Sequence, residues 1–278
     1  MTEIRTYPHG VPSWVDTIAH DLDEAKRFYA GLFDWTFTDA MPAEAPGHYL
    51  IATLGGQDVA AIGSPDSDDE AVTWRTYIAV DDADATAKAV ETSGGKVTMA
   101  PVEAGPGGRT ATCVDPRGAE FRLWQARKRP GAQLVNAPGS WGFSDLLTTD
   151  PHEAAKFYST LFGWEIDDIG FDATLIRKPG YGEHLATTVD PGIRERQGSF
   201  APPGFEDAIA WMKLEQEGRA EAWQVSFTVA DRDASAELAD NLGGKIVDSD
   251  EAEFTKSATI VDPQGAEFTI SQFTPPEG

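Results

Sequence analysis

Alternating apolar and polar residues open the first patterned segment of the chain and then give way to helical spacing. The alternation predicts a strand over Ser13–Ala19, because successive strand side chains point to opposite faces. Apolar residues then recur at the spacing of one helix face, and the helix is predicted to begin at Asp21, which has capping-box spacing to Glu24. Strand-like runs follow near Thr36, Tyr49–Leu54 and Val59–Ile62. The predicted order is therefore one strand, one helix and three strands.

The same order then begins again. A strand is predicted over Trp74–Val80, followed by a helix that Asp82 opens and that Gly94 and Gly95 close. Three further strands are expected near Val97, Ala111–Val114 and Glu120–Trp124. The sequence Asp-Pro-Arg-Gly from Asp115 is predicted to turn the last hairpin. This half of the chain therefore contains two βαβββ units.

Long segments of the first half return in the second half. Asp16–Trp35 aligns without gaps with Asp145–Trp164, and VDPRGAEF at Val114–Phe121 returns as VDPQGAEF at Val261–Phe268. Matching blocks in the same order indicate an internal duplication. We therefore predict an α+β protein of four βαβββ units. The predicted parts are a first domain at 10–127, a linker at 128–139 and a second domain at 140–274.

The second half carries an insertion that the first half lacks. The spacing of the matching blocks places it between Thr187 and Ala222, at about 190–220, with a short helix expected from about Glu206 to Leu214. Its aromatic residues include Phe200, Phe205 and Trp211. An aromatic segment beside a binding site is either a lid over an apolar ligand or a plug at an interface between domains or subunits.

The chain is strongly acidic, with 22 Lys and Arg residues against 46 Asp and Glu residues and a formal net charge of −24. Such a charge repels polyanions, and no basic cluster is visible, so nucleic-acid binding is not expected. The single cysteine, Cys113, lies in an apolar run and is expected to be buried and unreactive. The sequence lacks a signal-peptide core and a run of ~20 apolar residues. We therefore expect a cytoplasmic monomer or homodimer that does not bind membranes.

Several motifs in these units are shared with a known superfamily. Phe28-Tyr29, Leu32-Phe33 and Trp35, their copies in the second half and the closing DPxGAxF hairpins resemble the vicinal oxygen chelate superfamily. This superfamily holds the glyoxalases, the bleomycin-resistance proteins and the extradiol dioxygenases. The resemblance covers about nine-tenths of the chain. It implies two tandem glyoxalase-like domains, each with a cup-shaped sheet that holds a ligand and, in the enzymes, usually a metal ion.

The resemblance also indicates where a metal ion would be bound. In the metal enzymes, one ligand sits seven residues before the Asp that opens a helix, and a Glu sits seven residues after the Asp of the DPxG turn. The corresponding residues here are Trp14, Arg75, Phe143, Gln224, Arg122 and Thr269. None of them is His, Glu, Asp or Cys, and arginine cannot ligate a metal ion. No metal ion and no other cofactor is therefore expected.

Strand alternation predicts which side chains line the first cup. They are Trp14, Asp16, Arg75, Tyr77, Arg122 and Trp124. Arginines among aromatic rings suit a flat ligand with a carboxylate, phenol or quinone oxygen, because guanidinium binds oxyanions bidentately and stacks on rings. The alternative is that Asp16 neutralises the arginines in a structural ion pair.

The second cup is predicted to be largely neutral. It would be lined by Phe143, Asp145, Gln224, Ser226 and Thr269, with Phe200, Phe205 and Trp211 as the candidate lid. Asp16 and Asp145 occupy matching cup positions. A carboxylate in a concave apolar site is a candidate catalytic base, and the alternative is that it accepts hydrogen bonds from backbone amides at the rim.

The predicted function is metal-independent binding of a small aromatic or amphipathic organic molecule, as in the sequestration or biosynthesis of a natural product. One alternative is an enzyme that acts without a metal on an aromatic metabolite, in a hydroxylase-associated, cyclase or isomerase/lyase step. Asp16 or Asp145 would then be the base, and Arg75 and Arg122 would stabilise the oxyanion. The other is a metal-dependent glyoxalase- or dioxygenase-type enzyme with displaced ligands. These would be His184, predicted in a strand-like run, with Asp145 or Glu267.

Overall fold

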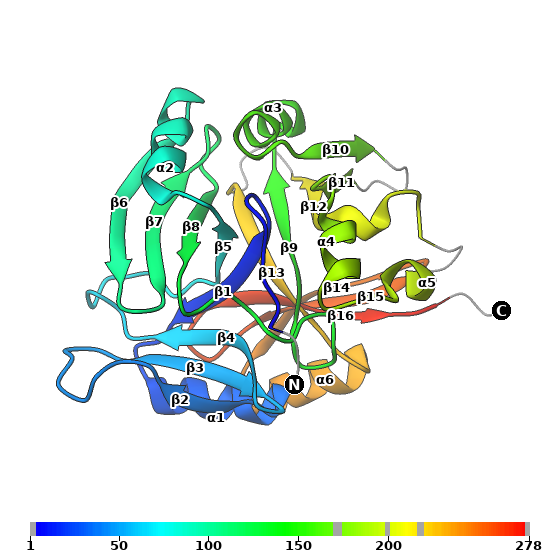
Figure 1. The fold of residues 1–278 in the computed structure, drawn as a ribbon. Helices are drawn as coiled ribbons and strands as arrows, with labels where there is room; N and C mark the ends of the chain where they lie inside the picture. Colours follow the sequence, from blue (N-terminus) through cyan, green and yellow to red (C-terminus); the bar gives the residue numbers. More distant parts are fainter. Residues whose placement is uncertain (1–3, 169–173, 198–200, 216–219, 276–278) are drawn as a thin grey trace. The chain divides into compact units, whose positions relative to one another are not determined.

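The structure is a computed structural model that describes residues 4–168, 174–197, 201–215 and 220–275. Helices and strands follow one another in the order of four βαβββ modules (Figure 1). The predicted α+β class and its four modules are therefore confirmed.

The first two modules have nearly the predicted bounds. Module 1 consists of β1 (Pro12–Ile18), α1 (Leu22–Phe33), β2 (Thr36–Asp39), β3 (Tyr49–Leu54) and β4 (Gln57–Gly63). Module 2 consists of β5 (Arg75–Ala79), α2 (Ala83–Thr92), β6 (Lys96–Ala104), β7 (Gly108–Val114) and β8 (Glu120–Ala126).

The last two modules repeat this order, and the insertion lies in module 3. Module 3 consists of β9 (Trp141–Thr148), α3 (Pro151–Phe162), β10 (Glu165–Asp168), β11 (Thr174–Arg177) and β12 (Ala208–Leu214). Between β11 and β12 lie α4 (Tyr181–Thr187), α5 (Ile193–Gln197) and the 3-10 helix η1 (Phe205–Asp207). Module 4 consists of β13 (Ala222–Thr228), α6 (Arg232–Asn241), β14 (Lys245–Ala252), β15 (Thr255–Val261) and β16 (Glu267–Phe273).

The strands form two eight-stranded sheets, and each module supplies four neighbouring strands. The module orders are β2-β3-β4-β1, β5-β8-β7-β6, β10-β11-β12-β9 and β13-β16-β15-β14. In every module the first and last strands pair in parallel. A parallel pair needs a crossover connection, and this connection contains the module's helix. The remaining neighbouring strands of each module pair antiparallel, and in module 3 the insertion separates one such pair, β11 and β12.

The chain separates into two compact units that each combine parts of both sequence halves. The first unit comprises Met1–Ser13, Thr76–Gly131 and Ser144–Trp223, and the second comprises Trp14–Arg75, Ala132–Phe143 and Gln224–Gly278. Helix packing explains this grouping, because α2 contacts α3 in the first unit and α1 contacts α6 in the second.

Four aspartates begin the four module helices. Asp21, Asp82, Asp150 and Asp231 each accept a hydrogen bond from the backbone N–H three residues further on, at 2.9–3.0 Å. Each bond satisfies one of the donors that a helix start leaves without an intrahelical partner. The helix starts predicted at Asp21 and Asp82 are confirmed.

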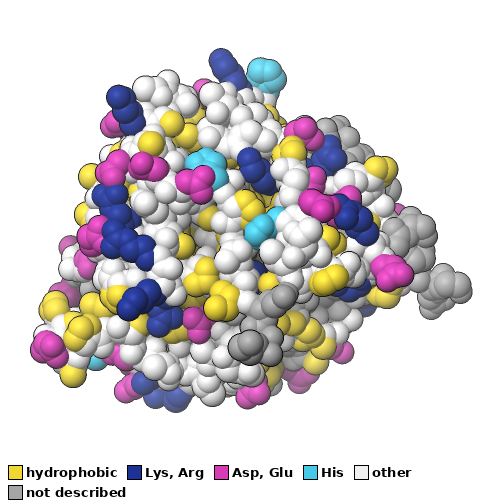
Figure 2. All heavy atoms as spheres, in the orientation of Figure 1, with side chains coloured by type: hydrophobic (Ala, Val, Ile, Leu, Met, Phe, Trp, Pro, Cys, Tyr) yellow, Lys and Arg dark blue, Asp and Glu magenta, His cyan; other side chains and the backbone are white. Residues whose placement is uncertain are grey.

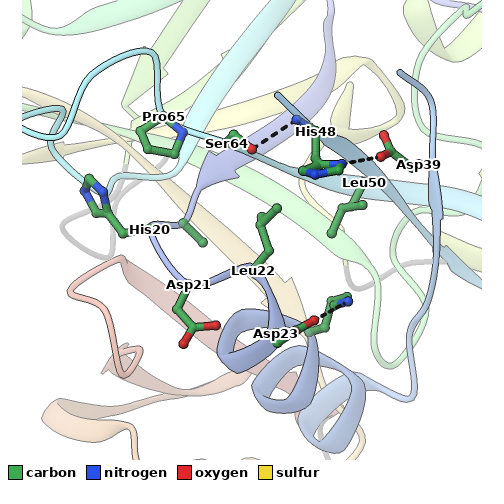
Figure 3. Close-up of a pocket in the computed structure, with 11 residues that line it drawn as sticks. His20, Asp21, Leu22, Asp23, Asp39, His48, Leu50, Ser64 and Pro65 are labelled. Atoms are coloured by element: carbon green, nitrogen blue, oxygen red, sulfur yellow. Dashed lines mark hydrogen bonds and ion pairs between the residues drawn. The ribbon is translucent and has the colours of Figure 1, made fainter. Parts of the chain in front are cut away.

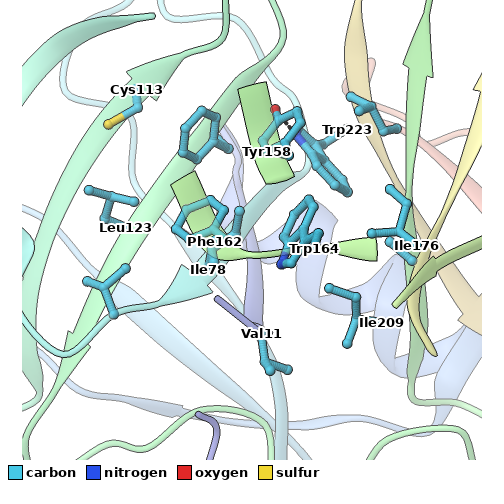
Figure 4. Packing of buried hydrophobic residues seen from close by; sticks show 14 of the residues in the cluster. Val11, Ile78, Cys113, Leu123, Tyr158, Phe162, Trp164, Ile176, Ile209 and Trp223 are labelled. Carbon is cyan, nitrogen blue, oxygen red and sulfur yellow. Dashed lines mark hydrogen bonds between the residues drawn. The ribbon is translucent and has the colours of Figure 1, made fainter. Parts of the chain in front are cut away.

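A buried aromatic cluster forms the core of the first unit (Figure 4). The Tyr158 hydroxyl donates to Asp115 Oδ2 at 3.1 Å and accepts from Trp223 Nε1 at 2.9 Å. Trp164 stacks on Tyr158 at 4.9 Å and donates to the Gly10 carbonyl at 2.6 Å. Burial raises the pKa of Tyr158 well above its ordinary value, so the hydroxyl remains a hydrogen-bond donor.

The second unit repeats this arrangement with equivalent residues. The Tyr29 hydroxyl donates to Asp262 Oδ2 at 2.9 Å and accepts from Trp74 Nε1 at 3.0 Å. Trp35 stacks on Tyr29 at 5.5 Å and donates to the Gly139 carbonyl at 2.7 Å. The residues that carried the sequence resemblance therefore build the core of each unit.

The insertion begins earlier than the sequence spacing predicted. It lies between Arg177, which ends β11, and Ala208, which begins β12, so the predicted limits Thr187 and Ala222 are wrong. The helix predicted from Glu206 to Leu214 is also wrong, because residues 208–214 form β12. This segment pairs with β11 on one side and β9 on the other, and this tertiary pairing outweighs local helix propensity.

Helices α4 and α5 are packed parts of the first unit. Tyr181, Leu185 and Ile193 are buried in its core cluster. His184 lies on α4 and not on the predicted strand, and its Nε2 lies 3.0 Å from the Thr6 carbonyl. The buried side chains of Tyr181, Leu185 and Ile193 therefore attach the described part of the insertion to the core.

Candidate functional site

Tyr77, Arg122 and Trp124 lie close together on β5 and β8 of the first unit. The parallel register pairs Tyr77 with Arg122 and Ala79 with Trp124. Arg122 Nη1 donates to the Tyr77 hydroxyl at 3.2 Å, and Arg122 Cζ lies 5.7 Å from the Tyr77 ring centroid. Trp124 meets Tyr77 edge-on at 6.3 Å. A cation whose side chain is 18% exposed is therefore held against the Tyr77 ring.

The indole of Trp124 is fixed by the segment that follows β8 and by the hairpin that joins β6 and β7. Its Nε1 donates to the Arg129 carbonyl at 2.9 Å. A Cβ at Gly108 would come within 2.5 Å of the Gln125 carbonyl and 2.9 Å of the Trp124 ring. Glycine at position 108 therefore lets the hairpin pass close to the indole, which keeps the ring in one place.

Asp16 lies in the second unit, where two aromatic side chains approach its carboxylate. Tyr49 donates its hydroxyl proton to Asp16 Oδ2 at 2.9 Å and accepts from Trp14 Nε1 at 2.9 Å. Asp16 is 3% exposed and Trp14 8%. Strand β4 lies between β1 and β3, and small residues there, Ala61 opposite Asp16 and Gly63 opposite Tyr49, leave room for the ring.

Tyr49 was not predicted to be a site residue. The strand-like run Tyr49–Leu54 predicted its strand. The strand order and the small residues of β4 were needed to bring its hydroxyl to Asp16, and the sequence pattern does not show either directly.

Arg75 begins β5 and pairs with a carboxylate that the sequence analysis also missed. Its Nη2 forms an ion pair with Glu70 Oε1, which lies in the loop between β4 and β5. The Arg75 side chain is 10% exposed and that of Glu70 is 25% exposed. Glu70 stands among acidic residues at 66–70, a run that reads as an ordinary exposed loop in the sequence.

Asp145 occupies the matching position in the first unit and has a different partner. Its Oδ2 lies 2.7 Å from Lys213 Nζ on β12. Asp145 is 6% exposed, whereas the Lys213 side chain is 49% exposed. Asp145 Oδ1 is buried and accepts no hydrogen bond from the residues that the structure describes. The sequence analysis missed Lys213 because its segment was predicted to be helical.

The predicted lid residues have different locations. Trp211 lies on β12, so it is part of the sheet and not of a lid. Phe205 lies in η1, with its ring 6.1 Å from that of Trp211. Phe200 lies outside the described residues.

Four predicted residues of the second cup lie in the second unit. Ser226 and Thr269 are neighbours on β13 and β16 and are 8% and 7% exposed. Gln224 Nε2 donates to Glu267 Oε1 at 3.1 Å, and Phe143 is half-buried on β9. Ser226, Thr269, Gln224 and Phe143 are uncharged, which is consistent with a neutral lining.

Three residues at the expected metal positions cannot ligate a divalent ion. Arg122 and Arg75 are cationic, and the Trp14 indole can only donate, so none of them offers a lone pair to a metal. Among the described residues, no group of three or more His, Cys, Asp or Glu side chains is placed to hold a metal ion. The displaced-ligand alternative therefore finds no such group around His184 in the described part of the chain.

A surface pocket of about 690 Å³ lies beside the start of α1 in the second unit (Figure 3). His48 Nδ1 lies 2.6 Å from Asp39 Oδ2, and Lys26 Nζ lies 2.6 Å from Asp23 Oδ1. The bond to His48 and the Met41 amide hold the pKa of Asp39 below its ordinary value. Two pairs of the pocket's polar side chains thus bond to each other, and none of the predicted cup residues lines this pocket.

Two remaining features bear on chemistry. Cys113 is fully buried, as predicted, and burial raises the pKa of its thiol to about 12, so the nucleophilic thiolate is not formed near neutral pH.

Figure 2 shows acidic and basic side chains interspersed on the face that it presents. Arg127 with Glu103 and Arg109 with Asp84 are examples of such pairs.

Two tandem sets of βαβββ modules define a class of proteins, and the comparison with family models agrees. The glyoxalase/bleomycin resistance protein/dioxygenase superfamily model matches residues 12–123, and a glyoxalase-like domain model matches residues 143–271. The chain belongs to the glyoxalase/bleomycin resistance protein/dioxygenase superfamily.

Particular relatives match over almost the whole chain. CFP32 of Mycobacterium tuberculosis, which carries a provisional glyoxylase name, is 34% identical over 99% of this chain and 99% of its own length. The anthracycline biosynthesis protein DnrV of Streptomyces peucetius is 32% identical over 94% of this chain and 92% of its own length.

Solved structures of low sequence identity share the fold. The Mn(II)-bound glyoxalase from Novosphingobium aromaticivorans has a TM-score of 0.61 at 16% identity and covers 99% of this chain and 84% of its own. The 2,3-dioxygenase LapB from Pseudomonas has a TM-score of 0.58 at 12% identity, over 96% and 94% of the two chains.

No helix in the described residues has both the length and the apolar character needed to span a bilayer.

Proposed function

We propose that this protein binds a flat aromatic organic anion without the help of a metal ion. The observation that carries the proposal is the placement of Arg122, at a position where a metal ligand is expected in the enzymes, against Tyr77, whose ring in turn meets Trp124. A guanidinium beside aromatic rings attracts a carboxylate or quinone oxygen and also stacks on a flat ring. Because Tyr77 holds the guanidinium in place, little ordering is left for the binding step.

The names of two relatives support the same ligand class. DnrV and DauV are described as anthracycline biosynthesis proteins and match this chain at 32% identity. Anthracyclines are flat polycyclic quinones, so their chemistry fits a site of aromatic rings and a cation. We take a polycyclic aromatic acid or quinone as the ligand class of this protein.

The proposal can be tested by calorimetric titration with anthraquinone-2-carboxylate. Arg122→Met keeps the length of the side chain and removes its charge, so we expect affinity to fall by at least ~1.5 kcal/mol, about tenfold. The neutral anthraquinone-2-carboxamide is the matched ligand, and its affinity should change far less. Equal affinity of the variant and the parent for the carboxylate would remove Arg122 from the site.

A second candidate is a metal-independent reaction on the same ligand class, and the position of Asp16 favours it. A carboxylate that is 3% exposed and bonded to the Tyr49 hydroxyl could accept a proton directly or through that hydroxyl. Asp145 beside Lys213 is the alternative base in the first unit. Mass spectrometry of the ligand after incubation separates the candidates, since binding alone returns it unchanged. Conversion that persists in both Asp16→Asn and Asp145→Asn would exclude these carboxylates as the base.

A further inference from the structure

The loop between β4 and β5 places a carboxylate of the protein itself on Arg75. Glu70 Oε1 is ion-paired with Arg75 Nη2, and the Arg75 side chain is only 10% exposed. An external anion can therefore form a close contact with this guanidinium most readily at the place that Glu70 occupies. Carboxylates pair with guanidinium in the same geometry wherever they come from. The Glu70 carboxylate is thus a model of a ligand carboxylate at this position.

We propose that Glu70 is an internal competitor that determines the ligand specificity of Arg75. A ligand with a full negative charge replaces one carboxylate–guanidinium pair by another, so it can displace Glu70. A neutral phenol or quinone oxygen offers a weaker partner and leaves Glu70 in place. This inference rests on the proposed function and narrows its ligand class to aromatic carboxylates and comparable anions.

The attachment of Glu70 allows such a displacement. Residue 70 belongs to an irregular loop, and its side chain is 25% exposed. Glu70 Oε2 accepts from the Asp66 amide at 2.7 Å, and the Glu70 amide donates to the Ser67 carbonyl at 3.1 Å. The Glu70 carbonyl also lies 3.1 Å from His20 Nε2, outside this loop, which holds the backbone of residue 70. The bond from the Asp66 amide to the side chain is local to the loop, so it can break without disturbing either strand. Released Glu70 would enter water, which solvates its charge.

The second half of the chain provides a comparison. Gln224 corresponds to Arg75 in the repeat, and its side-chain amide donates to Glu267 on β16 at 3.1 Å. The partner there is fixed to a strand, and the neutral amide does not attract an anion as a guanidinium does. A carboxylate on a loop thus accompanies the position at which the chain has an arginine.

The test compares Glu70→Gln with the parent protein by titration with anthraquinone-2-carboxylate and with anthraquinone-2-carboxamide. We expect Glu70→Gln to bind the carboxylate five- to tenfold more tightly and the carboxamide within twofold of the parent. Glu103→Gln removes one acidic charge from an exposed ion pair with Arg127 and is the matched control for net charge, with an expected change of less than twofold.

Two further measurements separate this inference from the proposed function. In a Glu70→Gln/Arg75→Met double variant, the gain should disappear, because the competitor acts only through Arg75. Hydrogen exchange of residues 64–74 should increase when the parent protein binds the carboxylate. Glu70→Asp keeps the charge, shortens the reach, and should give a smaller gain if Glu70→Gln folds poorly.

Each outcome decides one of the two proposals. If Arg75→Met and Arg122→Met weaken binding but Glu70→Gln leaves it unchanged or weaker, Glu70 is a structural partner and the competitor idea is overturned. If neither arginine variant changes binding, or the carboxylate does not bind at all, the proposed function fails and this inference fails with it.

Discussion

Asp16 and Asp145 occupy the same position in the repeat, yet their surroundings differ in kind. Asp16 accepts a hydrogen bond from the neutral Tyr49 hydroxyl, which accepts from Trp14. Asp145 lies 2.7 Å from the ammonium group of Lys213. Both carboxylates are almost fully buried, at 3% and 6% exposure. The duplication has thus kept the carboxylate while changing what neutralises or solvates it.

The cores around these two positions show the opposite behaviour. Tyr29 with Asp262 and Trp74 in the second unit repeats Tyr158 with Asp115 and Trp223 in the first, bond for bond. Core packing tolerates few changes of shape, whereas side chains that line a cup can change without cost to the core. The difference teaches that the partners of these two carboxylates have diverged while the core scaffold has not.

The largest expected effect is the loss of unfolding free energy in two matched core variants, which tests whether the two cores are equivalent. Phe157 packs against Phe121 in the first unit, and Phe28 packs against Phe268 in the second, at centroid distances of 6.2 and 6.3 Å. Phe157→Ala and Phe28→Ala should each lower the free energy of unfolding by about 3–5 kcal/mol, because each leaves a cavity in a closed core. Urea denaturation followed by tryptophan fluorescence measures both.

The control for this pair is Leu214→Ala, since Leu214 is 72% exposed and its truncation should cost less than ~0.5 kcal/mol. A loss below ~1 kcal/mol for either phenylalanine, with a full loss for the other, would show that the two cores are not equivalent.

The fold could be predicted from the sequence because its signals are local. Alternation predicted β1, and the aspartates Asp21 and Asp82 predicted helix starts that the structure confirms. Strand β12 was missed because its identity depends on pairing with β9 and β11 and not on its own residues. The grouping of modules into compact units depends on helix packing, which periodicity does not encode.

The candidate site was predictable only in part, and the partners were the part that was missed. Arg122, Tyr77 and Trp124 could be placed together by alternation on neighbouring strands. Tyr49 and Glu70 were not identified, because Tyr49 reaches its partner across a strand and Glu70 from a loop. Lys213 was not identified because its strand was predicted to be a helix. The charge state of a site depends on such partners, so the chemistry of the cups requires the structure.

The next effect concerns the two carboxylates themselves. Lys213→Met should lower the free energy of unfolding by about 1–2 kcal/mol, because it leaves buried Asp145 without its cation, although the half-exposed ammonium limits the loss. Tyr49→Phe should cost about 1 kcal/mol, since Asp16 loses a neutral donor. Denaturation at low and high NaCl distinguishes the two variants. Salt should reduce the loss of unfolding free energy caused by Lys213→Met and should leave the loss caused by Tyr49→Phe unchanged.

Lys26→Met is the matched control for this comparison, because Lys26 pairs with Asp23 on the surface, where the side chains are 40% and 77% exposed. Its cost should lie near zero at either salt concentration. If Tyr49→Phe and Lys213→Met responded to salt in the same way, the distinction between a neutral and an ionic neighbourhood would be wrong.

The smallest expected effect concerns Asp115, which accepts from Tyr158 in the first core. Burial raises the pKa of Asp115, although backbone amides and Tyr158 oppose this rise. The protonated form of Asp115 is therefore favoured in the folded state. The stability that this preference contributes is fully present below the unfolded-state pKa, and it is lost as pH rises through the folded-state pKa.

Asp115→Asn removes this titration while its side-chain carbonyl can still accept from the backbone amides of 117–119, which bond to Asp115 Oδ1 at 2.8–3.0 Å. The unfolding free energy of the parent relative to Asp115→Asn should therefore decrease as pH rises above the ordinary pKa of an aspartate. Urea denaturation of both proteins at several pH values measures this difference directly. A difference that stays constant or grows with pH would mean that the amides and Tyr158 stabilise the carboxylate by more than burial destabilises it. The first core would then hold Asp115 as a stabilised anion, and its bonds would be charge-assisted ones.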